Sequence, residues 1–170
     1  MLYDVSQVLK NFGESMELSG EIECPEKRIA GASPVFKNLA FKGRITNIGG
    51  VLELKVSTSG SYVVLCSRCA KEINADLKKD FTEILVNSDT ADYEDKDDAV
   101  LFEGHSVDVS EIVTANILLS LPSVFLCSED CRGLCHKCGA DLNAEQCGCT
   151  DDETDPRWDA LKNFVIRESE

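Results

Sequence analysis

The chain has 170 residues, of which 43% are hydrophobic and 28% are charged. This balance is typical of a compact globular domain and argues against wholesale disorder and against collagen-like or coiled-coil classes. The 31 acidic and 17 basic residues give a formal net charge of −14. That charge argues against a protein that coats a nucleic-acid backbone, which needs clustered Lys and Arg, and is compatible with a basic protein partner.

The N-terminal residues predict a short helix followed by a strand. Asp4 or Ser6 can cap a helix over residues 7–10, which Gly13 ends. Over residues 16–23 apolar and polar side chains alternate, which is the pattern of a half-buried strand.

Residues 39–86 carry the strongest strand signal. Apolar and polar residues alternate over 39–45, 52–56 and 73–77, the last strand continuing toward Val86, and an apolar run covers 62–65. Glycine-containing turns are expected at 47–50 and 59–61. We therefore expect an antiparallel β-meander that forms a barrel-like body.

Residues 88–98 interrupt the strand pattern with six acidic residues and one Lys, and predict a mobile acidic loop. The loop lacks the central Gly and closing Glu of a calcium site. Farther along, Asp108 and Glu111 have the spacing of a capping box, so a helix is expected over 109–120, ending before Pro122.

These elements predict an α+β protein, mainly antiparallel, in three parts. A β-rich body covers residues 1–126, a cysteine-rich zinc-binding module covers 127–150 and packs on the body, and a C-terminal helix lies within 151–170. In that helix Asp155 is the cap and Pro156 takes the first helical position. Trp158, Leu161 and Val165 then line one face, which we expect to pack against the body.

No stretch approaches the roughly 18 to 20 continuous apolar residues of a membrane helix. The N-terminal residues have no basic leader followed by an apolar core, so we expect no secretory signal and a cytoplasmic location. In a reducing compartment, nine cysteines favour metal ligation over disulfide bonds.

Eight cysteines form four closely spaced pairs that predict two structural zinc sites, because zinc prefers four soft ligands in a tetrahedron. Cys135, Cys138, Cys147 and Cys149 are close enough in sequence to form a compact zinc ribbon or knuckle. The remaining quartet is Cys66, Cys69, Cys127 and Cys131, which only the fold can bring together. An exchange of Cys131 and Cys135 between the two sites stays open, and Cys24 is expected to bind no metal.

An alternative interpretation of Cys66-x2-Cys69 is the dithiol of an oxidoreductase. Such a pair normally lies at a helix N-terminus in a βαβ unit, whereas this one follows a hairpin and leads into another strand. The sequence also lacks a phosphate-binding Gly-rich loop and a nucleophile elbow. We therefore expect no enzymatic activity and no small-molecule substrate.

Four basic residues lie among the cysteines, namely Arg68, Lys71, Arg132 and Lys137. Each four-thiolate zinc site carries a net charge of about −2, so these cations are expected to compensate it. They also form a weaker candidate site for RNA phosphate on an otherwise acidic protein. His136, beside them, is expected to be exposed rather than a ligand.

The cysteine pattern and its neighbours resemble those of a known family. The matching residues are Cys66-Ser-Arg-Cys69, Leu121-Pro122, the string from Cys127 to Asn143, Cys147-Gly-Cys149, and Asp155-Pro-Arg-Trp158. In this order, over most of the chain, they resemble the YceD-like large ribosomal RNA subunit accumulation proteins. The resemblance implies a bacterial or plastid factor implicated in accumulation of large-subunit ribosomal RNA, whose gene often neighbours that of a small basic ribosomal protein of the large subunit. It supplies no catalytic residues.

Together these observations predict a non-enzymatic factor in large ribosomal subunit biogenesis that binds a basic ribosomal protein through its acidic surface. Two alternatives remain. One is direct binding of ribosomal RNA or the pre-ribosome through the four basic residues and the exposed face of the sheet. The other is a thiol oxidoreductase that uses Cys66 and Cys69.

Overall fold

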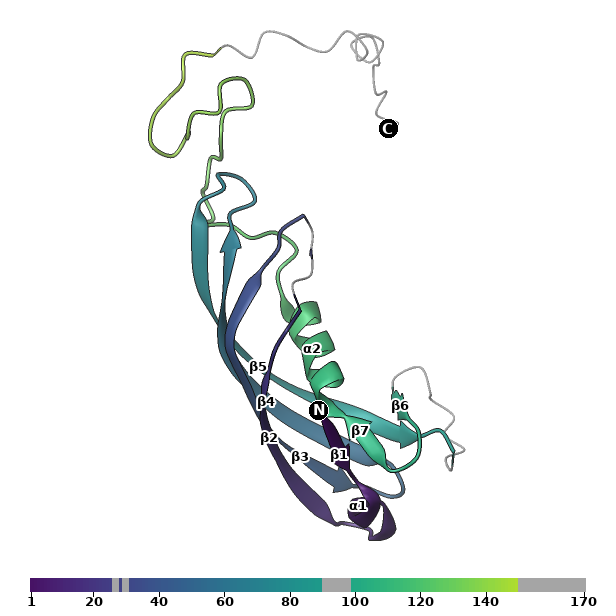
Figure 1. Cartoon of the computed structure of the whole chain (residues 1–170). Helices are drawn as coiled ribbons and strands as arrows, with labels where there is room; N and C mark the ends of the chain where they lie inside the picture. The colour runs from purple at the N-terminus through teal and green to yellow at the C-terminus, as the bar shows by residue number, and fades with distance from the viewer. Residues whose placement is uncertain (26–27, 29–30, 90–98, 150–170) are drawn as a thin grey trace, which may run out of the picture.

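The computed structural model describes residues 1–25, 28, 31–89 and 99–149. Its main element is a five-stranded sheet with the strand order β2-β3-β4-β5-β6 (Figure 1). These strands are β2 (Ser15–Ile22), β3 (Val35–Asn47), β4 (Leu52–Leu65), β5 (Glu72–Asn87) and β6 (Val100–Phe102). A small second sheet pairs β1 (Leu2–Asp4) with β7 (Ser106–Asp108), and the helices are α1 (Ser6–Lys10) and α2 (Val109–Ser120).

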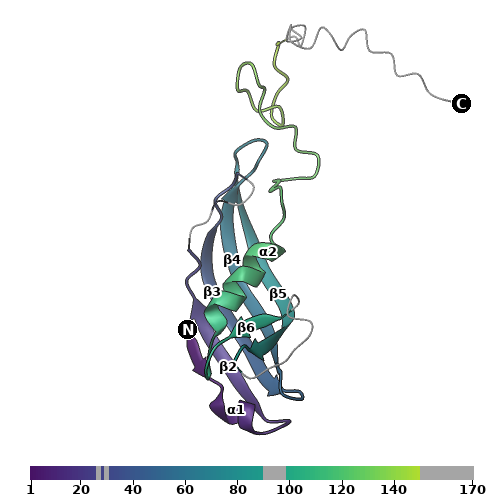
Figure 2. The same ribbon diagram turned by 90° about the vertical axis from the view of Figure 1, so that its right-hand side faces the viewer.

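The expected α+β fold with a mainly antiparallel sheet is confirmed. Strands β2 to β5 form an antiparallel meander, while β6 joins β5 in parallel. The sheet is open in the described part of the chain, with β2 and β6 at its two edges, so the barrel-like body is not a closed barrel. The long strands bow along their length, and α2 crosses one face of the sheet (Figures 1 and 2).

The core lies between the sheet and α2, because the side chains of each strand alternate between two faces. Inward positions of β3 and β4 carry Ile45, Leu52 and Leu54, which are fully buried. Helix α2 covers them with Val109, Ile112, Val113 and Ile117. The other face of the sheet has no helix on it in the described residues (Figure 1), and this leaves Lys42, Arg44 and Lys55 facing outward.

The turn predicted at 59–61 is wrong. Residues 52–65 form the single strand β4, which pairs without interruption with β5 from Leu52 to Leu65. Gly60 marks a close approach instead, since a Cβ atom there would lie 2.6 Å from Cδ2 of Leu39 on β3. Strand β3 shifts register beside it, between Lys37 and Ala40. A glycine inside a strand therefore marks a bulge of the neighbouring strand rather than a turn.

Asp108 is the N-cap of α2, as its position in the sequence predicts. Its carboxylate accepts hydrogen bonds from the backbone N–H groups of Ser110 and Glu111. The helix ends at Ser120, two residues before Pro122. The amino group of Met1, 2.7 Å from Oδ1, and the Ser110 hydroxyl together lower the pKa of Asp108 to about 2.

Replacing Asp108 with Asn is expected to reduce stability in a pH-dependent way. Asn keeps a capping oxygen but loses the charge that attracts the helix N-terminus and the amino group. Because the folded-state pKa lies below the unfolded value near 3.8, the charge contributes stability above pH 4 and loses it as the pH falls toward 2. Urea unfolding should show a difference of about 1 kcal/mol at neutral pH that disappears near pH 2. A pH-independent difference would contradict this.

Two expectations fall wholly or mainly outside the described residues. These are the acidic loop over 88–98, of which only Ser88 and Asp89 are described, and the C-terminal helix within 151–170. Among the described residues, neither helix has the length and apolarity needed to cross a membrane.

Candidate metal centres

The β4–β5 turn and the segment after α2 bring four cysteines together. Cys66 and Cys69 lie in that turn, and Cys127 and Cys131 follow α2 by several residues. Their four sulfur atoms lie within 4.8 Å of one another. Sγ of Cys66 is 3.8 Å from that of Cys131, and Sγ of Cys69 is 3.5 Å from that of Cys127. We call these four residues the first cysteine cluster.

The backbone holds the two halves of the first cluster together. The N–H of Ser67 donates to the carbonyl of Phe125 at 2.8 Å, and the N–H of Cys127 donates to Sγ of Cys66 at 3.4 Å. Phe125 is itself buried against Tyr62 on β4, with ring centroids 5.9 Å apart. The residues after α2 are therefore fixed onto the end of the β4–β5 hairpin by aromatic packing as well as by hydrogen bonds.

In this cluster the surroundings lower the pKa of the Cys66 thiol and raise that of the Cys69 thiol. Burial raises the pKa of Cys66, but backbone N–H groups of Cys69, Arg68 and Cys127 outweigh it and lower the value to about 6. The backbone N–H of Lys71 lowers the pKa of Cys69, but burial and the neighbouring sulfurs raise it to about 12. Four sulfurs this close cannot all ionise without a cation between them.

The cluster fits a four-thiolate zinc site by its donor set and spacing. A tetrahedron of sulfurs about 2.3 Å from a zinc ion has edges of about 3.8 Å, which matches the distance of 3.8 Å between the sulfurs of Cys66 and Cys131. Both of these sulfur–sulfur distances are far longer than the roughly 2.05 Å of a disulfide bond, and none of the nine cysteines forms a disulfide. Zinc bound here would cross-link the β4–β5 turn to the segment after α2.

The second cysteine cluster comprises Cys135, Cys138, Cys147 and Cys149, whose sulfurs also lie within 4.8 Å of one another. A tight turn presents the first pair, because the N–H of Gly139 donates to the carbonyl of Cys135 at 2.8 Å. Gly139 has a φ of 75°, a conformation that suits glycine. Backbone N–H groups of Cys138 and Lys137 lower the pKa of Cys135 to about 6, whereas the sulfurs of Cys138 and Cys135 and partial burial raise that of Cys149 to about 12.

The second cluster rests on the first through contacts that sequence spacing does not reveal. The N–H of Leu134 donates to the carbonyl of Arg68 at 3.1 Å, and the Arg68 guanidinium donates to the carbonyl of Cys131 at 2.8 Å. Asn143 accepts from the N–H of Arg132 at 2.8 Å, and its side-chain N–H₂ approaches Sγ of Cys131 at 3.6 Å. Asn143 thus links both clusters, and only its place in the fold identifies it.

The structure therefore brings eight cysteines together in the same two groups of four that their spacing in the sequence predicts. Cys24 lies in neither group and packs, half-buried, beside the hydrophobic core. Cys66 and Cys69 lie in a turn between antiparallel strands rather than at the start of a helix. Because Cys127 and Cys131 surround them, the arrangement differs from the exposed pair of a dithiol enzyme.

The four basic residues near the cysteines have different surroundings. Nζ of Lys71 is 2.8 Å from a carboxylate oxygen of Asp141, which raises the pKa of Lys71 and helps lower that of Asp141 to about 2. Arg68 is engaged with Cys131, as described above. Arg132 and Lys137 are exposed and lie beside the second cluster. Their use as an RNA contact remains a prediction.

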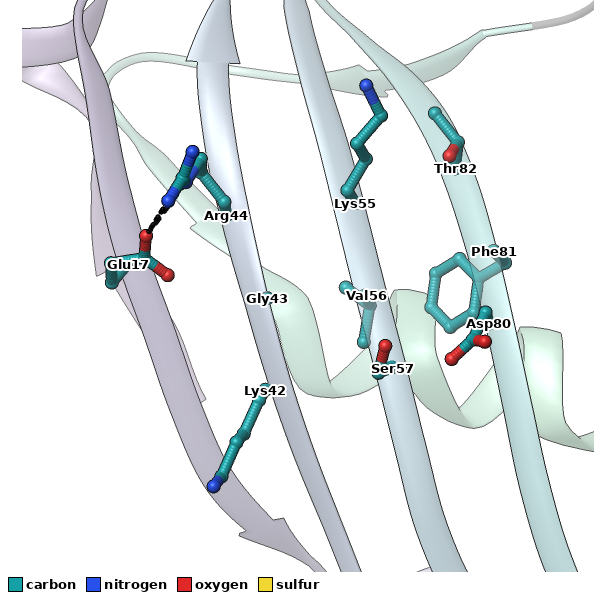
Figure 3. A pocket seen from close by; sticks show the side chains of 10 residues that line it. All are labelled: Glu17, Lys42, Gly43, Arg44, Lys55, Val56, Ser57, Asp80, Phe81 and Thr82. Carbon is teal, nitrogen blue, oxygen red and sulfur yellow. Dashed lines mark hydrogen bonds and ion pairs between the residues drawn. The ribbon is translucent and has the colours of Figure 1, made fainter.

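A second group of basic residues lies on the outer face of the sheet, turned away from α2 (Figure 3). An open hollow of about 850 Å³ runs across β2 to β5, and Lys42, Arg44 and Lys55 line it together with Ser57 and Thr82. Arg44 donates to Glu17 at 2.7 Å. The alternation of β3 and β4 predicted outward polar residues here, but not that these cations would come together across two strands.

Substituting Cys138 with Ser is expected to loosen residues 133–149 while leaving the sheet folded. Structural zinc binding is itself folding free energy, so losing one ligand should cost several kcal/mol locally. The first cluster has its own ligands and contacts, which this substitution leaves in place. Limited proteolysis should show faster cleavage within 133–149 and an unchanged β-strand core. Unaltered protease sensitivity in this segment would contradict the prediction.

Comparison with known proteins adds a family to this geometry. Residues 54–165 match the family described as large ribosomal RNA subunit accumulation protein YceD, a span that includes both cysteine clusters and α2. A Bacillus subtilis relative, the uncharacterized protein YlbN, is 27% identical over 173 residues, which cover 99% of this chain and 97% of that protein.

Other matches are partial. An uncharacterized Mycobacterium tuberculosis protein is 29% identical over 107 residues, which cover 62% of this chain and 51% of that protein. This chain therefore spans about half the length of its mycobacterial relatives. An Arabidopsis thaliana protein named large ribosomal RNA subunit accumulation protein YCED homolog 1, chloroplastic, is 32% identical over 62 residues, or 36% of this chain and 19% of its own. No solved structure matches the chain.

Proposed function

Because the chain belongs to the family of large ribosomal RNA subunit accumulation protein YceD, we propose that it acts in the cytoplasm in biogenesis of the large ribosomal subunit. The family match carries this proposal, since it covers residues 54–165 and includes both candidate metal centres. The name of the Arabidopsis relative, which concerns the same process, supports it.

The finer proposal is that the protein binds a basic ribosomal protein and holds it until ribosomal RNA replaces it. The net charge of −14 supports this role, and two four-thiolate zinc sites would add about −4. Ribosomal RNA is a far denser polyanion than this surface, so it can take over the basic partner. Electrostatic attraction of this kind speeds association and weakens as salt screens the charges.

We propose that the two metal centres are structural and that the protein catalyses no reaction. Zinc held by four cysteine thiolates has a filled coordination shell, and its contribution is to cross-link the chain. The first cluster would fix the segment after α2 onto the β4–β5 turn, and the second would shape the residues up to Cys149. Alkylation with and without a chelator tests this role, because ligated thiolates should be protected until zinc is removed.

Recovery of basic ribosomal proteins from cell lysate tests the finer proposal. The full chain, immobilised through an affinity tag, is expected to retain a basic ribosomal protein at low salt and to release it at high salt, because the charges are then screened. Mass spectrometry of the eluate identifies the protein, and an unrelated acidic protein of similar charge serves as the control. Recovery of no basic ribosomal protein in either condition would reject the proposed partner.

Direct contact with ribosomal RNA is a second candidate, favoured by the outward cations Lys42, Arg44 and Lys55 in one hollow of the sheet. The exposed Arg132 beside the second cluster is the alternative contact point. A gel shift with large-subunit RNA at low salt, where phosphate contacts are strongest, should weaken with Lys42→Glu or Arg132→Glu, according to which surface binds. Absence of any shift at low salt would reject direct binding.

A further inference from the structure

Helix α2 is apolar on the side that faces away from the sheet as well as on the side that packs against it. Leu119 is 84% exposed, which makes it the most exposed large hydrophobic residue among those described, and Ala115 is exposed one turn earlier. Leu101 on the neighbouring strand β6 is 51% exposed. Exposed apolar side chains that gather at one place commonly mark an interaction site.

Two hollows flank α2 along its length. The one toward β6 has a volume of about 430 Å³ and is lined by Val100, Leu101, Ile112 and Leu119 among others; we call it the α2–β6 groove. The hollow on the opposite side, toward β2, has a volume of about 600 Å³ and contains Ile22 and Leu118. Both are open to solvent along an apolar helix, and their linings share Asp108, Glu111 and Ala115.

The charged side chains that the structure describes in the two hollows flanking α2 are all acidic. Glu83, Asp108 and Glu111 line the α2–β6 groove, and Glu21 and Glu23 join them on the β2 side. Among the described residues, neither lining includes a Lys or Arg side chain, and the amino group of Met1 is already paired with Asp108. The sequence has no Lys or Arg between Ala99 and Cys131. The hollow on the opposite face of the sheet, by contrast, contains three cations together with the carboxylates of Glu17 and Asp80 (Figure 3).

We propose that the α2–β6 groove is the docking surface for a basic, amphipathic segment of a partner protein. Apolar side chains of the segment would cover Leu101 and Leu119, while its Lys and Arg side chains would meet Glu83 and Glu111. Nucleic acid does not fit this surface, because its phosphates would face carboxylates. The inference rests on the proposed function in that it assigns the basic partner a place on the molecule.

The side chains at the rim are available for such a partner without rearrangement of the fold. Oε1 of Glu83 accepts a hydrogen bond from the side-chain N–H₂ of Asn116 at 2.8 Å, which orients the carboxylate beside the groove. Glu111 is exposed in the first turn of α2, where the helix N-terminus favours a negative charge. Hydrophobic contact would supply affinity, and the carboxylates would supply charge selectivity.

Peptide binding to the full chain tests this docking surface. The probe is a fluorescein-labelled amphipathic peptide of leucine and lysine, followed by fluorescence anisotropy at low and high salt. Leu119→Glu is expected to weaken binding about tenfold or more, because burial of a Leu side chain is lost. Phe12→Glu is the matched control, since Phe12 is 80% exposed and lies outside both hollows flanking α2. It should bind like the wild type.

Charge selectivity is tested with two double variants, each of which removes two negative charges and so has the same net charge as the other. Glu83→Gln with Glu111→Gln should weaken binding and reduce its salt dependence, and the Gln at position 83 can still accept from Asn116. Glu17→Gln with Glu53→Gln removes the same charge elsewhere and should change binding little. Two further peptides, with Ser in place of Leu or Glu in place of Lys, should bind weakly.

The outcomes separate this inference from the proposed function. If the peptide binds the wild type and Leu119→Glu equally, the docking surface is wrong while a basic partner still stands. If it binds neither at low salt, both the docking surface and the basic partner fail. If Leu119→Glu converts a dimer into a monomer, as seen by sedimentation, and the wild type binds no peptide, the groove is instead an interface between two copies.

Discussion

Cys66→Ser is expected to release the segment after α2 from the sheet and to disturb both cysteine clusters. Cys66 is 3% exposed, and its sulfur accepts a hydrogen bond from the N–H of Cys127, so the substitution removes a candidate metal ligand and a backbone contact together. Loss of one ligand from a structural zinc site should cost several kcal/mol, because the binding free energy of the metal is folding free energy. Metal analysis should show about one zinc ion fewer per chain.

The effect of Cys66→Ser should spread farther than that of Cys138→Ser. The second cluster rests on Arg68 and on the Cys131 turn, so loosening the first cluster removes its support. Protease cleavage is therefore expected throughout residues 123–149, and not only within 133–149. Cys24→Ser is the matched control, because Cys24 belongs to neither cluster. Unchanged metal content and an unchanged digestion pattern in Cys66→Ser would contradict the assignment.

Asn47→Leu is expected to destabilise the body of the protein by about 2–4 kcal/mol. Asn47 is 4% exposed, and its side-chain N–H₂ donates to the carbonyls of Val8 at 2.8 Å and Leu9 at 3.2 Å. Its side-chain oxygen accepts the N–H of Gly50 at 3.0 Å. A leucine of similar size would fill the space but leave the carbonyls at the end of α1 and the N–H of the β3–β4 turn without these partners.

Urea unfolding followed by circular dichroism measures this loss as a lower midpoint with an unchanged slope. The matched control is Asn74→Leu, because Asn74 is exposed on β5 and its substitution leaves no buried group unpaired. Hydrogen exchange should accelerate at α1 and at the β3–β4 turn in Asn47→Leu. A stability equal to that of the wild type would show that water replaces the amide at no cost.

Local patterns in the sequence were sufficient to predict the fold class and the positions of most helices and strands. Alternation of apolar and polar residues located β2, β3 and β5, and the Asp108 cap with Pro122 located α2 to within a residue or so. Such features act between neighbours in the chain, so they can be recognised without the fold. The Cys-x2-Cys spacings belong to the same class, since each pair shares one turn.

Contacts between distant segments were not predictable in the same way. The three-residue strands β1, β6 and β7 are too short to show an alternation of apolar and polar residues. They form because each pairs with a strand that is distant in the sequence: β1 with β7, and β6 with β5. From the sequence alone, Gly60 predicted a turn. In the structure a glycine is required there because the side chain of Leu39 approaches the backbone closely. Likewise, the links through Asn143 and between Lys71 and Asp141 depend on how the two cysteine clusters stack.

By itself the sequence determined the acidic charge, the mainly antiparallel α+β class, and the pairs of thiols available for metal, because composition and short spacings are properties of the chain. The tertiary structure alone decided which thiol pairs meet across 57 intervening residues, from Cys69 to Cys127. It also separated the charges in part, placing three cations and two carboxylates in the hollow of the outer face and, among the described residues, only carboxylates along α2. That separation depends on strand register and helix placement, which long-range packing sets.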